Sequence, residues 1–168
     1  MSKAFTRDDD SSQPVLQRPV SPLPPGVKNY ITADGAKRLE DELKQLREIE
    51  RPRAVTSNDA GKVEALQKID QRIAYVDQSL QSAEVVLPPT EPDDKVRFGA
   101  TVTVRDKTGT ETKYRIVGVD ETDIDRDWVS WRSPIAKALL NARVGQRVKF
   151  QIPAGLQEWE IVAISYQA

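Results

Sequence analysis

The stretch from Ala54 to Ala65, AVTSNDAGKVEA, lies between two long segments whose apolar residues recur at helical spacing. It is short and polar, and it contains Ser, Asn, Asp and Gly, the residue types that favour turns. Two helical segments joined by a short turn of this kind form an antiparallel hairpin. This stretch therefore predicts a helical hairpin as the first folded part of the chain.

The apolar residues on both sides of the turn support the hairpin, because they recur at intervals of three or four, the spacing of a narrow coiled-coil seam. The two expected seams are Ala36, Leu39, Leu43, Leu46 and Ile49, then Val63, Leu66, Ile69, Ile73, Val76, Leu80 and Ala83. Thr32 is the predicted N-cap of the first helix. Pro52 lacks an amide hydrogen and should bend the first arm or end its regular part early.

Beyond the hairpin, helical spacing gives way to alternation of apolar and polar residues, which predicts strands. The five expected strands are FGATVTVRD (98–106), KYRIVGVD (113–120), DWVSW (127–131), QRVKFQIP (146–153) and EWEIVAISY (158–166). Gly109 supplies the permissive backbone of a hairpin turn in DKTGT. Ser133 and Pro134 fit the N-cap and first position of one short helix, whose expected apolar face is Ile135, Ala138 and Leu139.

These patterns predict an α+β fold, an antiparallel helical hairpin followed by a small antiparallel sheet with one short helix. Four segments are expected along the chain. They are a disordered, proline-rich arm (1–28), a coiled-coil domain (29–87), a linker (88–95) and a C-terminal domain (96–168).

Composition excludes several classes of function. The chain has no cysteine and no histidine, so it can form no disulfide and offers neither a thiolate nor an imidazole to a metal. Its 25 basic and 26 acidic residues nearly cancel, which gives no general attraction to nucleic acid or to an acidic membrane. We expect a soluble, intracellular protein because no apolar run approaches eighteen residues and no signal-peptide pattern is present. The lack of cysteine fits the cytoplasm. We expect no cofactor.

Several segments resemble the bacterial transcript cleavage factors of the Gre family (GreA and GreB). The resemblance runs from about Asn29 to the end of the chain, and its most specific parts are FGATV, YRIVG and SPIAKALL…VG…V…PAG, in one order at natural spacing. It implies a coiled coil joined to a domain like the FK506-binding proteins. It also implies that the C-terminal domain docks at the secondary channel of bacterial RNA polymerase while the coiled coil projects inwards.

The resemblance implies a chemical role for the hairpin tip, where acidic residues of the family help to hold a magnesium ion at the polymerase active site. The family motif is a Gly-Asp pair, two further residues, and Glu-Asn. This sequence has instead Asp59 and Glu64, five residues apart, with Lys62 between them. We expect Asn58 or Asp59 to cap the second helix. Each arm is also about one heptad shorter than in the family, which shortens its reach by about 10 Å.

The leading hypothesis is therefore a factor that binds RNA polymerase and modulates transcription by occupancy, without stimulating transcript cleavage and without being an enzyme itself. Docking is expected at the largest subunit's helical hairpin, with no sequence-specific DNA binding and no membrane contact. The expected docking residues match the family's Ser-Pro helix start: Arg132, Ser133, Pro134, Ile135 and Lys137. We expect the factor to act as a monomer and to bind no metal of its own.

Three alternatives remain open from the sequence. The first is a genuine cleavage-stimulating factor that uses Asp59 and Glu64, with magnesium only as part of the polymerase site. The second is a prolyl isomerase, which rests on fold analogy alone. The third is a coiled-coil interaction module that associates with itself through the flanks of the hairpin.

Overall fold

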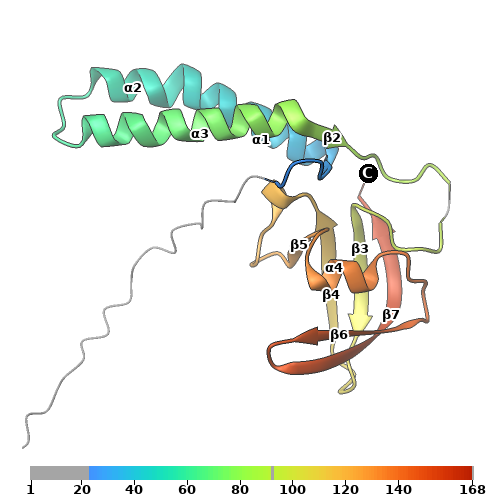
Figure 1. Cartoon of the computed structure of the whole chain (residues 1–168). Coiled ribbons are helices and arrows are strands. Elements are labelled where there is room, and N and C mark those ends of the chain that lie inside the picture. Colours follow the sequence, from blue (N-terminus) through green and yellow to red (C-terminus); the bar gives the residue numbers. More distant parts are fainter. Residues whose placement is uncertain (1–22, 92, 168) are drawn as a thin grey trace, which may run out of the picture.

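The computed structural model describes residues 23–91 and 93–167, so most of the predicted N-terminal arm lies outside the described residues. A helical hairpin stands over one end of a curled sheet (Figure 1). The hairpin elements are β1 (Asn29–Ile31), α1 (Ala33–Gln45), η1 (Leu46–Glu50), α2 (Arg51–Thr56), α3 (Lys62–Ser82) and β2 (Ala83–Val85). The C-terminal elements are β3 (Ala100–Arg105), β4 (Glu111–Val117), η2 (Val119–Glu121), β5 (Trp128–Ser130), α4 (Pro134–Leu139), β6 (Arg147–Ile152) and β7 (Gly155–Tyr166).

The first helix begins as the sequence predicts. Thr32 has extended backbone angles, and its side chain accepts a hydrogen bond from the amide of Gly35. Asp34 lies in the first turn, where a negative charge is favourable at the positive end of the helix dipole. The N-cap prediction for Thr32 is confirmed.

The first arm changes its winding before Pro52. Regular α-helix ends at Gln45, and residues 46–50 form a π-turn in which the amide of Arg51 donates to the carbonyl of Leu46. The ring of a proline crowds the carbonyl four residues before it, and a wider turn at that place relieves the crowding. The expected early end of the regular part is confirmed.

The hairpin seam is buried at the base and open towards the tip. Leu39, Leu46 and Val76 are buried, whereas Ile49 and Val63 are 50% and 78% exposed. A π-turn holds one residue more than an α-turn, so Ile49 rotates away from the seam that a uniform helical period predicts. Val63 lies in the first turn of the regular helix α3, next to the exposed turn at the tip. The prediction that Ile49 and Val63 complete the two seams is therefore wrong.

A short parallel pair of strands closes the base of the hairpin, and the sequence did not predict it. Asn29 pairs with Ala83 and Ile31 with Val85, so β1 and β2 join the two ends of the hairpin. Ala83 was expected to end the helical seam, but α3 ends at Ser82. Ile31 is buried against Leu39 and Val76, which places the small hydrophobic core of the hairpin at its base.

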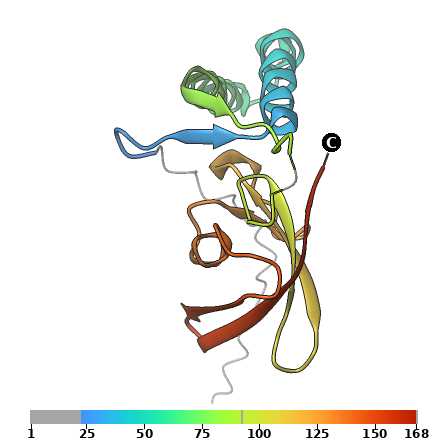
Figure 2. The ribbon, with the colours of Figure 1, turned by 90° about the vertical axis from the view of Figure 1, so that its right-hand side faces the viewer.

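The C-terminal sheet has the strand order β5-β4-β3-β7-β6. Three of its pairings are antiparallel, as expected, but β5 pairs with β4 in parallel, which makes the sheet mixed. A register shift between Thr103 and Val104 accompanies the curl of the sheet seen in Figure 2, since a bulge bends and twists the strand that carries it. The predicted α+β class is confirmed.

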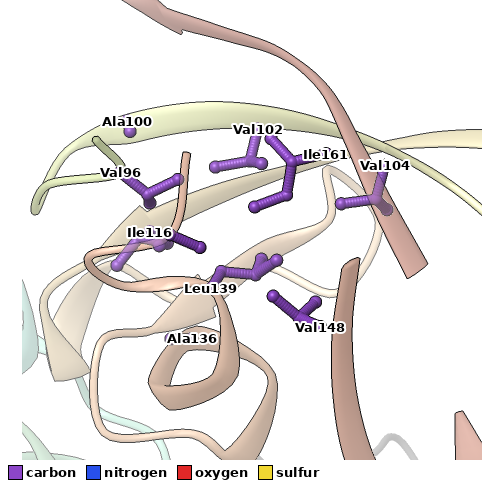
Figure 3. Close-up of a cluster of buried hydrophobic side chains, with 10 residues drawn as sticks. Val96, Ala100, Val102, Val104, Ile116, Ala136, Leu139, Val148 and Ile161 are labelled. Carbon is purple, nitrogen blue, oxygen red and sulfur yellow. The ribbon is translucent and has the colours of Figure 1, made fainter. Parts of the chain in front are cut away.

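Helix α4 covers the inner face of this curled sheet. Ala136 and Leu139 point from the helix towards buried residues of the strands, among them Val102, Ile116 and Ile161 (Figure 3). All five are fully buried. Ala136, rather than the expected Ala138, therefore belongs to the buried face, and the packing of α4 fixes where its first turn lies.

Candidate functional site

The first candidate site is the start of helix α4. The hydroxyl of Ser133 accepts a hydrogen bond from the amide of Ala136 at 3.2 Å, and Pro134 occupies the first helical turn. Ser133 therefore has a structural role as the N-cap, which confirms that part of the sequence prediction. Whether Ser133 also contacts a partner stays a prediction.

The five predicted docking residues are close in space but face different ways. Pro134 and Lys137 are exposed, and Ser133 is half-buried beside them. Ile135 packs against the core of the C-terminal domain, so little of it is free for a partner. The amide of Arg132 donates to the hydroxyl of Ser130 at 3.2 Å, which holds the chain in a tight bend before the helix. We call Arg132, Ser133, Pro134 and Lys137 the α4 surface.

The second candidate site is the tip of the hairpin. The hydroxyl of Ser57 accepts from the amide of Asp59 at 3.2 Å, and the carbonyl of Asp59 accepts from the amide of Lys62 at 3.1 Å. The N-cap of α3 is Gly61, which offers no side chain. The prediction that Asn58 or Asp59 caps this helix is wrong, because the turn is closed by the backbone of Asp59 and not by its carboxylate.

The two tip carboxylates differ in their surroundings. Glu64 lies in the first turn of α3 and forms an ion pair with Lys68 at 3.1 Å, one turn further along the same helix. Asp59 is exposed, and its carboxylate makes no hydrogen bond or ion pair with the described part of the chain. Residues 23–91 and 93–167 contain no group of three acidic side chains that could hold a metal ion.

The junction between the hairpin and the sheet contains a polar cluster that the sequence prediction missed. The buried carboxylate of Glu121 accepts from the amides of Thr32 and Gly118, at 3.0 and 2.8 Å, and from the hydroxyl of Thr32. Arg38 lies 3.5 Å from the same carboxylate. A buried charge is costly unless it is fully hydrogen-bonded, and these donors meet that requirement.

A second carboxylate, that of Asp120, binds the other helix of the hairpin. It accepts hydrogen bonds from the hydroxyls of Tyr75 and Ser79. Burial, together with the hydrogen bond to Asp120, raises the pKa of Tyr75 far above its ordinary value. Adjacent residues of η2 thus hold both helices of the hairpin, Glu121 through the start of α1 and Asp120 through α3.

Known proteins match the chain over most of its length. A family model described as "Transcription elongation factor, GreA/GreB, C-term" matches residues 91–166. The transcription elongation factor GreB of Neisseria meningitidis serogroup B is 38% identical over 155 residues, which cover 83% of this chain and 95% of that protein. This chain belongs to the GreA/GreB family.

Other members of the GreA/GreB family match to a similar extent. GreA of Alkalilimnicola ehrlichii is 36% identical over 152 residues, covering 81% of this chain and 96% of that protein. Among solved structures, Gfh1 of Thermus aquaticus is 27% identical with a TM-score of 0.40, covering 82% of this chain and 97% of that one. A GreA/GreB factor of Nitrosomonas europaea is 24% identical with a TM-score of 0.42, covering 83% and 99%.

No helix in the described part of this GreA/GreB family member is both long enough and apolar enough to cross a membrane. The family resemblance read from FGATV, YRIVG and the Ser-Pro helix start is confirmed by the relatives. The four domain boundaries, the docking residues and the oligomeric state stay predictions.

Proposed function

We propose that this protein binds bacterial RNA polymerase at the rim of the secondary channel and modulates transcription by occupying that channel. In this proposal the α4 surface docks on the helical hairpin of the largest subunit, and the protein's own hairpin points inwards. The factor stimulates no transcript cleavage and is no enzyme itself. Membership of a family of transcription elongation factors supports the coarse part of the proposal.

The proposal that the factor stimulates no cleavage rests on how the charged residues are arranged at the hairpin tip. Metal delivery to a polymerase active site requires carboxylate oxygens that are free and that converge on one ion. Glu64 is paired with Lys68 and lies within a helix, whereas Asp59 lies on the turn before it. Lys62 adds a positive charge to the same turn. This arrangement supports a tip that fills space rather than one that binds magnesium.

The length of the hairpin gives independent support. The match to the Neisseria GreB spans 155 aligned positions but only 83% of the 168 residues, which is about 139, so about 16 positions lie opposite gaps in this chain. A loss of one heptad from each arm would account for most of them. Helix α3 has 21 residues and is about 30 Å long at 1.5 Å per residue. A tip drawn back by about 10 Å is too far from the reacting atoms for catalysis.

One observation favours the alternative, a factor that does stimulate cleavage. The carboxylate of Asp59 does not cap α3, so it is left facing solvent and able to bind an ion. Together with Glu64, this carboxylate could help to hold magnesium at the polymerase active site if the hairpin reached it.

The decisive experiment combines a transcript cleavage assay on stalled elongation complexes with a pull-down of RNA polymerase. We expect the native protein to bind polymerase and to yield no cleavage above the polymerase's own rate. The variant Asp59→Asn with Glu64→Gln should behave identically, because it keeps similar shapes and removes only the carboxylates. Magnesium-dependent cleavage by the native protein that disappears in this variant would establish the alternative. Failure of the native protein to bind polymerase would refute both functions.

A further inference from the structure

Three arginines surround the side chain of Trp128, apart from the α4 surface and the tip. The guanidinium carbon of Arg115 lies 4.7 Å from the centre of the indole ring, and those of Arg38 and Arg126 lie 5.2 Å from it. The arginines come from α1, from β4 and from the loop before β5. Since all three distances end at one ring, no two guanidinium carbons are more than roughly 10 Å apart. We call these four residues the arginine cluster.

Arg115 is the unusual member of the cluster. Its residue is only 6% exposed, yet its side chain forms no ion pair or hydrogen bond with residues 23–91 and 93–167, and its Nε is buried without an acceptor. Burying a charge without a partner is costly. The face of Trp128 offsets part of this cost, but an indole ring accepts no ordinary hydrogen bond from the guanidinium.

Two of the neighbouring carboxylates, those of Glu121 and Asp123, are already engaged. Both oxygens of Glu121 accept hydrogen bonds from Thr32 or Gly118, and Arg38 lies at the limit of hydrogen-bond length from it, at 3.5 Å. Asp123 accepts from the amide of Asp125 and pairs with Arg126 at 3.4 Å. These contacts neutralise part of the charge of Arg38 and Arg126 but leave the donors of Arg115 unused.

We propose that the arginine cluster is a binding site for a phosphoryl group, carried by a free nucleotide or by the backbone of RNA. The planar fork of a guanidinium matches two phosphoryl oxygens, and a group with three such oxygens accepts from more than one arginine at once. A carboxylate, with two oxygens and one charge, uses the cluster less fully. The ring of Trp128 attracts all three guanidinium groups and so opposes their mutual repulsion.

The side chains of Arg38 and Arg126 are 50% and 64% exposed. In this proposal the anion approaches from solvent beside these two arginines. The site draws residues from both the hairpin and the C-terminal domain. It is independent of the proposed polymerase contact, so binding here can be tested with the isolated protein.

The experiment is a titration of the full chain, followed by two-dimensional NMR of the tryptophan indole and arginine Nε–H groups. The chain has three tryptophans, and the variant Trp128→Phe identifies the indole signal of Trp128. The probes are inorganic pyrophosphate, ATP and a single-stranded RNA oligonucleotide. We expect at least one probe to shift the Trp128 and Arg115 signals in a saturable way. Saturation by ATP but not RNA would identify a nucleotide site, and the reverse would identify an RNA contact.

Three variants test whether the cluster itself is the site, and two of them, Arg126→Gln and the control Arg51→Gln, each remove one positive charge. Arg38→Gln with Arg126→Gln should weaken binding of the same probe at least tenfold, and Arg126→Gln alone should weaken it less. Arg51→Gln is the control, because Arg51 is an exposed arginine on the hairpin, paired with Asp70. It should leave the affinity unchanged within about twofold, apart from any general effect of charge.

Three results would overturn the proposal. The first is the absence of shifts at Trp128 and Arg115 with all three probes at millimolar concentration. The second is binding that the cluster variants and Arg51→Gln weaken equally. The third is a shift that grows linearly without saturating, which would mean an adventitious ion only. If the double variant does not fold, the single Arg126→Gln variant decides, since its side chain is largely exposed.

Discussion

At the scale of single residues, Glu121 is the side chain on which the arrangement of the molecule depends most. Its carboxylate is 2% exposed and joins the start of α1 to the end of β4 through Thr32 and Gly118. Two glycines make room for it. A Cβ on Gly35 would lie 2.1 Å from a carboxylate oxygen of Glu121, and a Cβ on Gly118 would lie 2.4 Å from the carbonyl of Tyr30.

The variant Gly35→Ala tests this close fit. In an unconstrained helix, alanine in place of glycine is favourable by up to about 1 kcal/mol. Here the added methyl group must displace a buried, hydrogen-bonded carboxylate, so we expect a loss of about 1–3 kcal/mol in the free energy of unfolding. For a chain of this size this lowers Tm by about 3–10 °C, measured by circular dichroism.

Gly61→Ala is the matched control for that variant. Gly61 begins helix α3, its φ is −86°, and no atom lies within 4 Å of the Cβ position. We expect its stability to change by less than about 1 kcal/mol. If Gly35→Ala proves as stable as Gly61→Ala, then Glu121 adapts easily, and the close packing at the junction does not hold the two parts together.

The raised pKa of Tyr75 predicts how stability depends on pH. Because burial raises this pKa in the folded state, the native protein retains a proton that the unfolded chain loses above about pH 10. The contribution of Tyr75 to stability is therefore complete below that pH and declines as pH rises above it. Burial also raises the pKa of Tyr114 and Tyr166, which adds to the decline.

Urea unfolding of the native protein and of Tyr75→Phe between about pH 8 and pH 11 measures this effect. Phenylalanine does not titrate, so the variant should lose stability less steeply above about pH 10. It also lacks the hydrogen bond to Asp120, which lowers stability below pH 10 without changing the slope there. Parallel declines in the two proteins would show that Tyr75 does not contribute to the alkaline loss.

At the scale of elements, the sequence predicts what depends on local chemistry. The N-caps at Thr32 and Ser133 and the disturbance before Pro52 follow from residues a few positions apart. So does the turn at Gly109, whose φ is 86° and whose amide donates to the carbonyl of Asp106. The pairing of β1 with β2 was missed because each strand has three residues, too few for a periodic signal, and its partner lies 54 positions away. The parallel pairing of β5 depends equally on the course of the chain in space.

In the candidate sites too, local sequence patterns miss contacts between residues that are far apart in the chain. The stretch DETDIDRD (120–127) is acidic and has the composition of a solvent-exposed loop, yet Glu121 within it is buried. Its burial results from a partner at Thr32, 89 positions earlier, which no local pattern reveals. The cap expected from Asn58 or Asp59 failed because residue type alone does not decide where a helix starts. The docking role of the α4 surface stays a prediction.

Helix α4 provides the test of docking. Pro134→Glu with Lys137→Glu replaces exposed residues and leaves the buried Ala136 and Leu139 in place. Glutamate is favourable at Pro134 in the first turn, and at Lys137 in the last turn it opposes the helix dipole only modestly, so the fold should survive. We expect the affinity for RNA polymerase to fall at least tenfold, because two like charges enter the centre of the proposed interface.

The control for docking is Lys149→Glu, a charge reversal at an exposed position of β6, where Lys149 lies between the buried Val148 and Phe150 and so faces the opposite side of the strand. It should bind polymerase almost as well as the native protein. Circular dichroism of each variant checks the fold. Undiminished binding by a well-folded Pro134→Glu, Lys137→Glu protein would remove the α4 surface from the interface and leave the proposed docking without a site.

At the scale of the whole molecule, the helical hairpin projects from the C-terminal domain. Figure 1 shows the tip at the far end of the hairpin from the C-terminal domain. Exposed ion pairs such as Arg51 with Asp70 lie along the hairpin, and each adds little to stability because solvent screens it. The position of the tip therefore depends on the junction, where Asp120 and Glu121 hold one helix each.

The proposed docking also predicts that this protein competes with a full-length cleavage factor for RNA polymerase. If the C-terminal domain docks where that of a full-length cleavage factor docks, the two proteins cannot bind one polymerase together, however short this hairpin is. Cleavage of backtracked RNA by a fixed amount of the full-length factor should then fall as this protein is added, and excess factor should restore it. The Pro134→Glu, Lys137→Glu variant should inhibit only at a concentration at least tenfold higher, because it competes through the same surface. Simultaneous binding of both proteins, or unchanged rescue when this protein saturates the polymerase, would show that the docking site is not shared. In that case family membership would stand, but action by occupancy of the channel would have to be abandoned.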